Sequence, residues 1–441
     1  MSVIERTIEL SEGINRLPWL DQHRQQARSV MATMVMPARK TEHWLNTPVT
    51  RVLNTLTEDN TYDRPESADI QSSYHINDLD ADTLVFVDGE FRSELSDTVA
   101  IEGVHLTAFS NADEHQRVLI AEQLNSVFSQ VQSPLNHIFA FQNSSLMKDG
   151  ALLQVSKNVC LPRPLRVVHV STQGSRADLP AHRLLCVLES GAQASLIEQF
   201  VTLGQGEAAF GSHLTEIVLA DNAQLKHYRL SLETGAAVAI AGVHVSLQRS
   251  AVYDAFNIGL GGLCKRTDIH VTHLGEGAQC VLKGVYLPRE KQHIDYHTCI
   301  EHAVPHCTTD EVFRGIMADE SKAVFNGRIH IHPDAQKTLA ELSNKNLLLS
   351  PKAEIYTKPE LEIYADDVRC AHGATVSQID DKALYYMQSR GISRKEAEVM
   401  LSFGFINELI EQIEIEALVN LLKPLLVGVF VKDSELKRHI L

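Results

Sequence analysis

The chain lacks the signatures that commonly mark an enzyme with its own catalytic site. It has no G-x-x-x-x-G-K-[ST] phosphate-binding loop, no H-E-x-x-H metalloprotease helix and no G-x-S-x-G nucleophile elbow. The run Gly259–Gly262 does not complete G-x-G-x-x-G and sits in no clear strand–helix–strand unit. A catalytic site with its own signature is therefore not visible in the sequence.

Cysteines are few and follow no pairing pattern. The 441 residues hold seven, an odd number, with no C-x-x-C, which is typical of free thiols in a reducing compartment. The first residues have no apolar core of a secretion signal, and no run of about 18 apolar residues could span a membrane. We therefore expect a cytoplasmic protein.

A basic surface is also missing. The chain has 40 lysines and arginines against 56 aspartates and glutamates, which gives a net charge of −16. Binding to nucleic acid or to an anionic membrane needs a dense basic face, so the sequence predicts neither partner. Hydrophobic residues make up 44% and charged residues 22% of the chain, which is ordinary for a globular protein.

Three regions of different texture are present. Apolar residues at helical spacing predict helices over 15–57, with an interruption at Pro37, followed by a polar linker or long loop over 58–82. Short strand-like segments then dominate, with one helical insertion near 113–131, before helical spacing returns at the C-terminal end. The predicted domains are 1–82, 83–375 and 376–441.

The turns of the middle region repeat. Alanines follow similar turn sequences at intervals of 31, 28 and 27 residues, at Ala192, Ala223, Ala251 and Ala278. A period of this length, made of strands and turns, predicts a β-solenoid in which each coil stacks on the one before. A β-sandwich or barrel with coincidentally similar turns is the alternative fold.

The C-terminal region carries recognisable helix boundaries. Asp380 can cap a first helix that Gly391 closes, and Ser393 with Glu396 forms a capping box for a second. A further amphipathic segment is predicted to end before Pro424. So much apolar surface needs a cover, which either a partner protein or the end of the solenoid could supply.

Cys370-Ala371-His372 is the most informative local motif. In a strand, residues two apart point to the same face, so the thiol and the imidazole would project together. Both groups bind transition metals, but a metal or iron–sulfur site usually needs about four ligands. The missing ligands would come from elsewhere in this chain or from another chain. The alternative is structural, a buried thiol with a hydrogen-bonded histidine at the solenoid end.

Residues 293–307 form the densest group of potential metal ligands. On a strand, alternate residues would share one face, and these are His293, Asp295, His297, Cys299 and Glu301. Imidazole, thiolate and carboxylate suit zinc or iron, so one hypothesis is a metal-dependent enzyme built on a solenoid. The other is an exposed assembly face without metal. His330 and His332 form a similar pair with the same two interpretations.

Several stretches within 293–410 resemble the SufB/SufD family of SUF iron–sulfur cluster assembly proteins. They are His302–Cys307, Ala323–Ile329, Ala335–Thr338, Ser343–Ser350, Lys358–Thr375 and Ser389–Ile392. The SufB branch typically carries an acidic His-Glu-Ala-Thr version of the motif that here reads Cys-x-His-Gly-Ala-Thr. Cys370 and Gly373 therefore make the resemblance one to the SufD branch.

The resemblance implies a right-handed parallel β-helix between N- and C-terminal helical domains. It also implies a non-catalytic scaffold, whose β-helix end pairs with a SufB-like subunit and whose C-terminal helices dock a SufC-like ATPase. Sulfur would arrive indirectly, from a cysteine desulfurase and its sulfur-transfer partner. Homodimers are an option for the isolated chain. A reduced flavin is associated with such complexes, but no residue here can be assigned to it.

The same resemblance implies a role for Cys370 and His372. The matching positions lie at the interface with the SufB-like subunit, where nascent iron–sulfur clusters are thought to form, and the histidine is the stronger candidate for binding iron or the cluster. The chain would then help to acquire iron and to build and transfer clusters. Two alternatives stay open: a SufB-like paralogue that is itself the main cluster carrier, and the metal-dependent solenoid enzyme.

Overall fold

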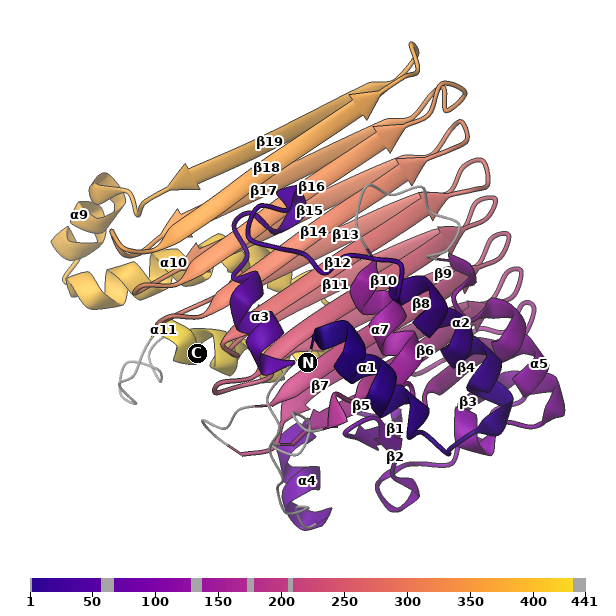
Figure 1. Cartoon of the computed structure of the whole chain (residues 1–441). Helices are drawn as coiled ribbons and strands as arrows, with labels where there is room; N and C mark the ends of the chain where they lie inside the picture. Colours follow the sequence, from indigo (N-terminus) through magenta and orange to yellow (C-terminus); the bar gives the residue numbers. More distant parts are fainter. Residues whose placement is uncertain (1, 57–66, 128–136, 173–177, 205–208, 431–441) are drawn as a thin grey trace.

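Two long sheets form the body of the protein in its computed structural model (Figure 1). The structure describes residues 2–56, 67–127, 137–172, 178–204 and 209–430. Along the middle region the chain alternates between the two sheets, so that each coil contributes one strand to each. This is the parallel β-solenoid that the repeat predicts, with helical regions at both ends of the chain. The sandwich and barrel alternatives are excluded.

Sheet A has ten strands in the spatial order β19-β17-β15-β13-β11-β9-β7-β5-β1-β2, and sheet B has nine in the order β18-β16-β14-β12-β10-β8-β6-β4-β3. The strands of sheet A are β1 Asp82–Val87, β2 Glu90–Phe91, β5 Leu165–Ser171, β7 Gln193–Thr202, β9 Gln224–Ser231, β11 Val252–Leu260, β13 Gln279–Leu287, β15 Thr308–Met317, β17 Leu339–Leu348 and β19 Arg369–Ser377. Those of sheet B are β3 Val104–Ala108, β4 Ala151–Val155, β6 Ala181–Leu188, β8 Phe210–Leu219, β10 Val238–Leu247, β12 Cys264–His273, β14 His293–His302, β16 Lys322–Ile331 and β18 Glu354–Ile363. Neighbours pair in parallel except β1 with β2 and β3 with β4.

The repeated alanines stand at corners of the solenoid. All four are fully buried, and the residue before each has a left-handed backbone with φ between 55° and 74°. Two of those residues are glycines and one is an asparagine, types that adopt this conformation readily. The corners also stack, because the amide of Asn222 donates to the carbonyl of Arg249 in the next coil. The repeat therefore records a tight corner with a small, inward-facing side chain.

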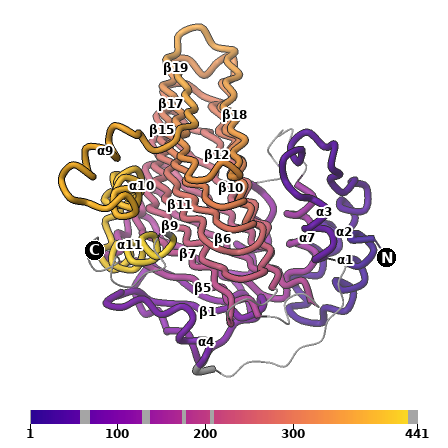
Figure 2. Tube along the Cα trace, turned by 90° about the vertical axis from the view of Figure 1, so that its left-hand side faces the viewer, coloured from indigo at the N-terminus to yellow at the C-terminus, as the bar shows by residue number. Residues whose placement is uncertain are grey.

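The N-terminal helices cover the outer face of sheet B (Figure 2). They are α1 Val3–Glu12, α2 Asp21–Met31, α3 Val49–Thr55 and α7 Ile138–Leu146, with 3-10 turns at Pro18–Leu20 and Glu42–Trp44. The guanidinium of Arg266 on β12 lies 4.1 Å from the ring centre of Trp44, and Thr47 donates a hydrogen bond to Asp295 on β14. This segment therefore shields part of the outer face of β12 and β14 from solvent.

The C-terminal helices α9 Asp381–Ser389, α10 Arg394–Ile410 and α11 Glu416–Phe430 lie on the opposite side, against sheet A (Figure 2). Asp380 caps α9, and Ser393 forms a capping box at the start of α10, both as predicted. The apolar residues of α10 and α11 share one buried cluster with outward-facing residues of sheet A such as Ile258 and Val285. The side of the solenoid thus covers this surface, whereas the sequence left open its end or a partner protein as the cover.

Two local expectations are wrong. The stretch 58–82 is expected to be a linker, but α4 forms within it at Ser67–Tyr74, because Ile70 and Tyr74 pack against outward-facing valines of sheet A. The last amphipathic segment is expected to end before Pro424, but α11 continues through that residue. Leu422 and Leu426 on either side are fully buried, and this burial offsets the cost of a proline inside the helix.

Other expectations can be compared with the structure only in part, because some of their residues lie outside the described part of the chain. The insertion near 113–131 contains α5 Glu114–Gln123, while its last residues, like 57–66 of the expected linker, lie outside the described part of the chain. The division into domains at 82 and 375 stays a prediction. In the described part of the chain, every helix is too short or too polar to cross a membrane.

The interior of the solenoid leaves no room for a side chain at Gly284 on β13. An added Cβ would lie 2.1 Å from Cε1 of Phe313, which is fully buried on the neighbouring strand. We expect Gly284→Ala to lower the free energy of unfolding by about 3 kcal/mol. Gly404→Ala is the control, because it meets no described atom within 4 Å inside α10 and should stabilise by roughly 0.5–1 kcal/mol. Equal urea midpoints for the two variants would contradict the prediction.

Candidate functional site

Cys370 and His372 lie on β19, the last strand of sheet A. Their register partners on β17 are Ala340 and Leu342, which both point into the solenoid core. Because parallel strands in register stack their side chains in rows, Cys370 and His372 occupy the same inward face, as the two-residue spacing predicts. Beyond β19 there is no further strand among the described residues. The pair therefore stands where the interior of the solenoid opens to solvent.

The surroundings of the two side chains differ. Cys370 is partly exposed and packs against the core, and this partial burial raises the pKa of its thiol. His372 is exposed. The structural alternative for the pair required a buried thiol and a hydrogen-bonded histidine. In the described residues no hydrogen bond holds the His372 ring, which leaves it free to turn toward a ligand.

The pair does not complete a metal site within the described residues. No third cysteine, histidine, aspartate or glutamate of that part of the chain joins Cys370 and His372 in a group close enough to hold one ion. The solenoid end also exposes apolar side chains, with Ile363 on β18 at 41% and Val376 on β19 at 50%. The β18–β19 end of the solenoid therefore lacks a complete set of metal ligands and exposes apolar side chains to solvent.

The stretch 293–307 lies largely on β14, and its alternate residues do share the outer face of sheet B. They do not form one site, because several are engaged elsewhere. The Asp295 carboxylate lies 3.0 Å from Arg266 Nη1 and 3.0 Å from His297 Nε2. Burial opposes its ionisation, but these two neighbours outweigh burial and lower its pKa. Asp295 thus acts as a buried partner of basic groups beneath the N-terminal segment.

Cys299 is also engaged. Arg328 Nη1 on β16 donates to its sulfur at 3.2 Å, and burial raises the pKa of the thiol to about 12. The guanidinium of Arg328 thus contacts the sulfur. Among the described residues, these five side chains do not bring their ligand atoms close enough together to hold one ion, so the geometry does not support the hypothesis of a five-ligand metal site on 293–307.

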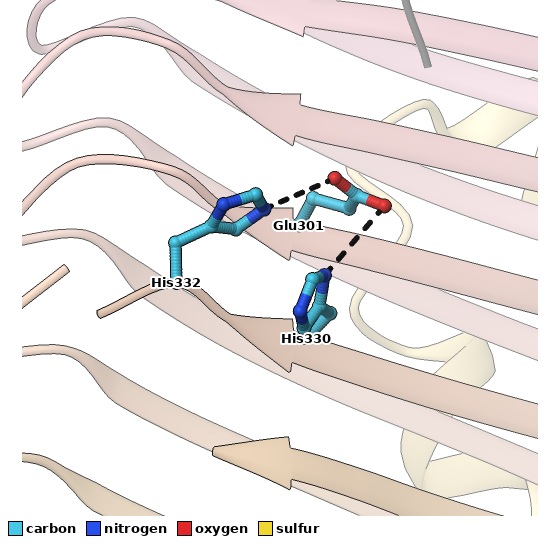
Figure 3. Close-up of side chains that lie close together, drawn as sticks. All are labelled: Glu301, His330 and His332. Carbon is cyan, nitrogen blue, oxygen red and sulfur yellow. Dashed lines mark hydrogen bonds and ion pairs between the residues drawn. The ribbon is translucent and has the colours of Figure 1, made fainter. Parts of the chain in front are cut away.

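One member of that stretch joins the His330–His332 pair instead. Glu301 Oε2 lies 3.3 Å from His332 Nε2, and Glu301 Oε1 lies 3.8 Å from His330 Nδ1 (Figure 3). Burial, and then the charge of Arg328, lowers the pKa of His330. Both histidines and the glutamate are visible in the sequence as potential ligands, but no local pattern connects them. The connecting signal is the coil repeat, which sets Glu301 in register with His330.

Family comparisons agree with this architecture. Residues 170–405 match the family described as "SUF system FeS cluster assembly, SufBD core domain", and residues 11–167 match the "SufBD protein N-terminal region". The chain belongs to the SufB/SufD family. The core match begins within β5 and ends within α10, so it takes in most of the solenoid, including Cys370 and His372.

Individual relatives favour the SufD branch. The iron–sulfur cluster assembly protein SufD of Escherichia coli is 31% identical over 92% of this chain and 92% of its own length. A SufBD family protein of Synechocystis is 28% identical over 90% of this chain and 88% of its own length. SufD of Bacillus subtilis is 28% identical over 64% of each chain. The recognition of a SufD-like member of the family is thereby confirmed.

Proposed function

We propose that this chain is a non-catalytic, SufD-like scaffold subunit that pairs with a SufB-like subunit to build iron–sulfur clusters. The observation that carries the proposal is the half-site of Cys370 and His372 on the bare end of the solenoid. Such a half-site suits a cluster held between two chains, since each chain supplies some of the ligands. Iron and the nascent cluster are the cargo of this site, and His372 is the principal ligand from this side.

The uncovered end of the solenoid is the proposed contact with the SufB-like subunit. β18 and β19 present unpaired backbone groups along their outer edges within the described residues, and such edges are templates for pairing with another chain. The exposed Ile363 and Val376 would be buried in that contact. The same edges would serve a homodimer when the chain is alone.

The C-terminal helices are the proposed dock for a SufC-like ATPase. Their inner faces are already used against sheet A, so docking needs residues on the outside. Tyr385 and Tyr386 on α9 are 75% and 59% exposed, and Met400 on α10 is 44% exposed. Exposed aromatic and methionine side chains are enriched at protein interfaces. ATP hydrolysis on that partner would rearrange the cluster-binding interface, and all partners would meet in the cytoplasm.

Co-expression with SufB-like and SufC-like subunits, followed by anaerobic purification, tests the proposal. We expect the complex to carry acid-labile sulfide and visible cluster absorbance, and the chain purified alone to carry neither. Acid-labile sulfide is the deciding measurement, because iron alone could bind at other histidines. A cluster held in full by the isolated chain, or no association with either subunit, would contradict the shared half-site.

A further inference from the structure

The outer face of sheet B carries a second group of metal ligands, on β14 and β16, beside the terminal strand β18. Glu301 on β14 faces His330 at the end of β16 and His332 just beyond it, and their ligand atoms all lie within 4.8 Å of one another. Figure 3 shows the carboxylate between the two rings, with one oxygen toward each. We propose that Glu301, His330 and His332 bind one exchangeable divalent transition-metal ion. This site is separate from Cys370 and His372 and does not depend on the function proposed for them.

Buried polar atoms without hydrogen bonds point to a missing ligand here. Glu301 is only 7% exposed, yet its Oε1 has no hydrogen-bond partner among the described residues, and neither has His330 Nδ1. Leaving a buried carboxylate oxygen without a hydrogen bond costs free energy. A cation between Glu301 and the two rings would satisfy both atoms at once.

The charged side chains around Glu301 do not balance its negative charge. Arg328 lies 3.7 Å from Glu301 Oε1, but its guanidinium donates two hydrogen bonds, at 2.8 and 2.7 Å, to the carboxylate of Glu362. Two carboxylates thus stand against one guanidinium, and the patch is net negative. A divalent cation corrects this imbalance, and Arg328 would then hold Glu362 in place beside the ion.

The ligand set indicates the type of ion. Two imidazoles and one carboxylate suit Zn²⁺ or Fe²⁺, whereas Mg²⁺ and Ca²⁺ prefer oxygen ligands throughout. Three protein ligands also leave at least one position for water, which is typical of an exchangeable ion and not of a closed structural site. His332 keeps 38% of its side chain exposed, so an ion could enter and leave from solvent.

Metal titration of the full-length chain tests the site. Zn²⁺, and Fe²⁺ under anaerobic conditions, are titrated against a chromophoric chelator with the wild type, Glu301→Gln and His332→Ala. Glu301→Gln keeps the side-chain volume, and His332→Ala removes a half-exposed ring, so neither should unfold the protein. His105→Ala is the matched control, because His105 is an exposed histidine at the far end of sheet B.

We expect the wild type and His105→Ala to bind one more ion per chain than Glu301→Gln and His332→Ala (the two triad variants), or to bind it at least about tenfold more tightly. Co²⁺ adds a spectroscopic check, since its visible absorption should lose the same component in both triad variants. Preference for Zn²⁺ or for Fe²⁺ in the wild type would identify the ion. Unchanged stoichiometry and affinity in both triad variants would overturn the proposal, and so would an equal loss in His105→Ala.

Discussion

A chain carrying His372→Ala is expected to join its partner subunits normally but to retain about tenfold less iron and acid-labile sulfide than the wild type. His372 is exposed on β19, and substitutions of exposed residues usually change stability by less than about 0.5 kcal/mol. The loss would therefore reflect a missing ligand and not a damaged fold. Iron and sulfide in the anaerobically purified complex measure the effect.

The matched control for this variant is Thr375→Ala. Thr375 is also exposed on β19, but the alternation along the strand places it on the opposite face from His372. Its substitution should leave cluster content unchanged. Wild-type loading by His372→Ala would exclude the proposed role. A large drop in melting temperature, together with nearly normal cluster content, would instead favour a purely structural role for Cys370 and His372.

The contribution of Glu311, inside the solenoid, to the stability of the wild type is expected to fall as the pH rises from 5 to 8. This side chain on β15 is fully buried, and burial raises its pKa from 4.5 to about 8. Thr298 donates one hydrogen bond to the carboxyl group at 2.6 Å. The titratable groups close to it, Asp310 and the thiol of Cys280, carry no positive charge that would stabilise the carboxylate. The folded protein therefore keeps Glu311 protonated at neutral pH.

Glu311 has different pKa values in the folded and the unfolded chain, and this difference makes its contribution to stability depend on pH. In the unfolded chain Glu311 ionises above its ordinary pKa, while in the folded chain it does so only near pH 8. The stabilising contribution is full below the ordinary value and is lost as the pH rises through the folded value. Between pH 5 and 8 this loss is on the order of 3 kcal/mol.

Glu311→Gln isolates this contribution, because glutamine resembles the protonated acid but does not titrate. Urea unfolding at pH 5, 6.5 and 8 should show similar stability for variant and wild type at pH 5 and a growing advantage for the variant above it. Glu341→Gln, at an exposed position on β17, is the matched control. If the difference in stability between Glu311→Gln and the wild type stayed the same at all three pH values, Glu311 would not be the titrating group.

The sequence was sufficient for the parts of the fold that depend on local geometry. The corner alanines reveal the coil because each corner needs the same left-handed residue followed by a small one. The caps at Asp380 and Ser393 are equally local. Helix α4 and the path of α11 through Pro424 were missed, because long-range burial against sheet A decides both.

The candidate sites also divide into features set by local sequence and features set by contacts between distant strands. The shared face of Cys370 and His372 follows from two residues of spacing within one strand. The group of Glu301 with His330 depends on which coils are neighbours and on their register, which no single stretch of sequence contains. The partners of Asp295 and Cys299 were missed for the same reason. Both residues look like free ligands in the sequence, because Arg266 and Arg328 contact them from other strands.

The two ends of the solenoid are not alike, and this difference would limit how many chains can assemble through the proposed β18–β19 contact. One end finishes in the short antiparallel strands β2 and β3, while the other finishes in the parallel strands β18 and β19. Two chains that meet through their β18–β19 ends leave no such end for a third, so this contact alone would build a pair and not a filament. Identical and related chains would then compete for one docking position, and the supply of each subunit would set the proportion of mixed pairs.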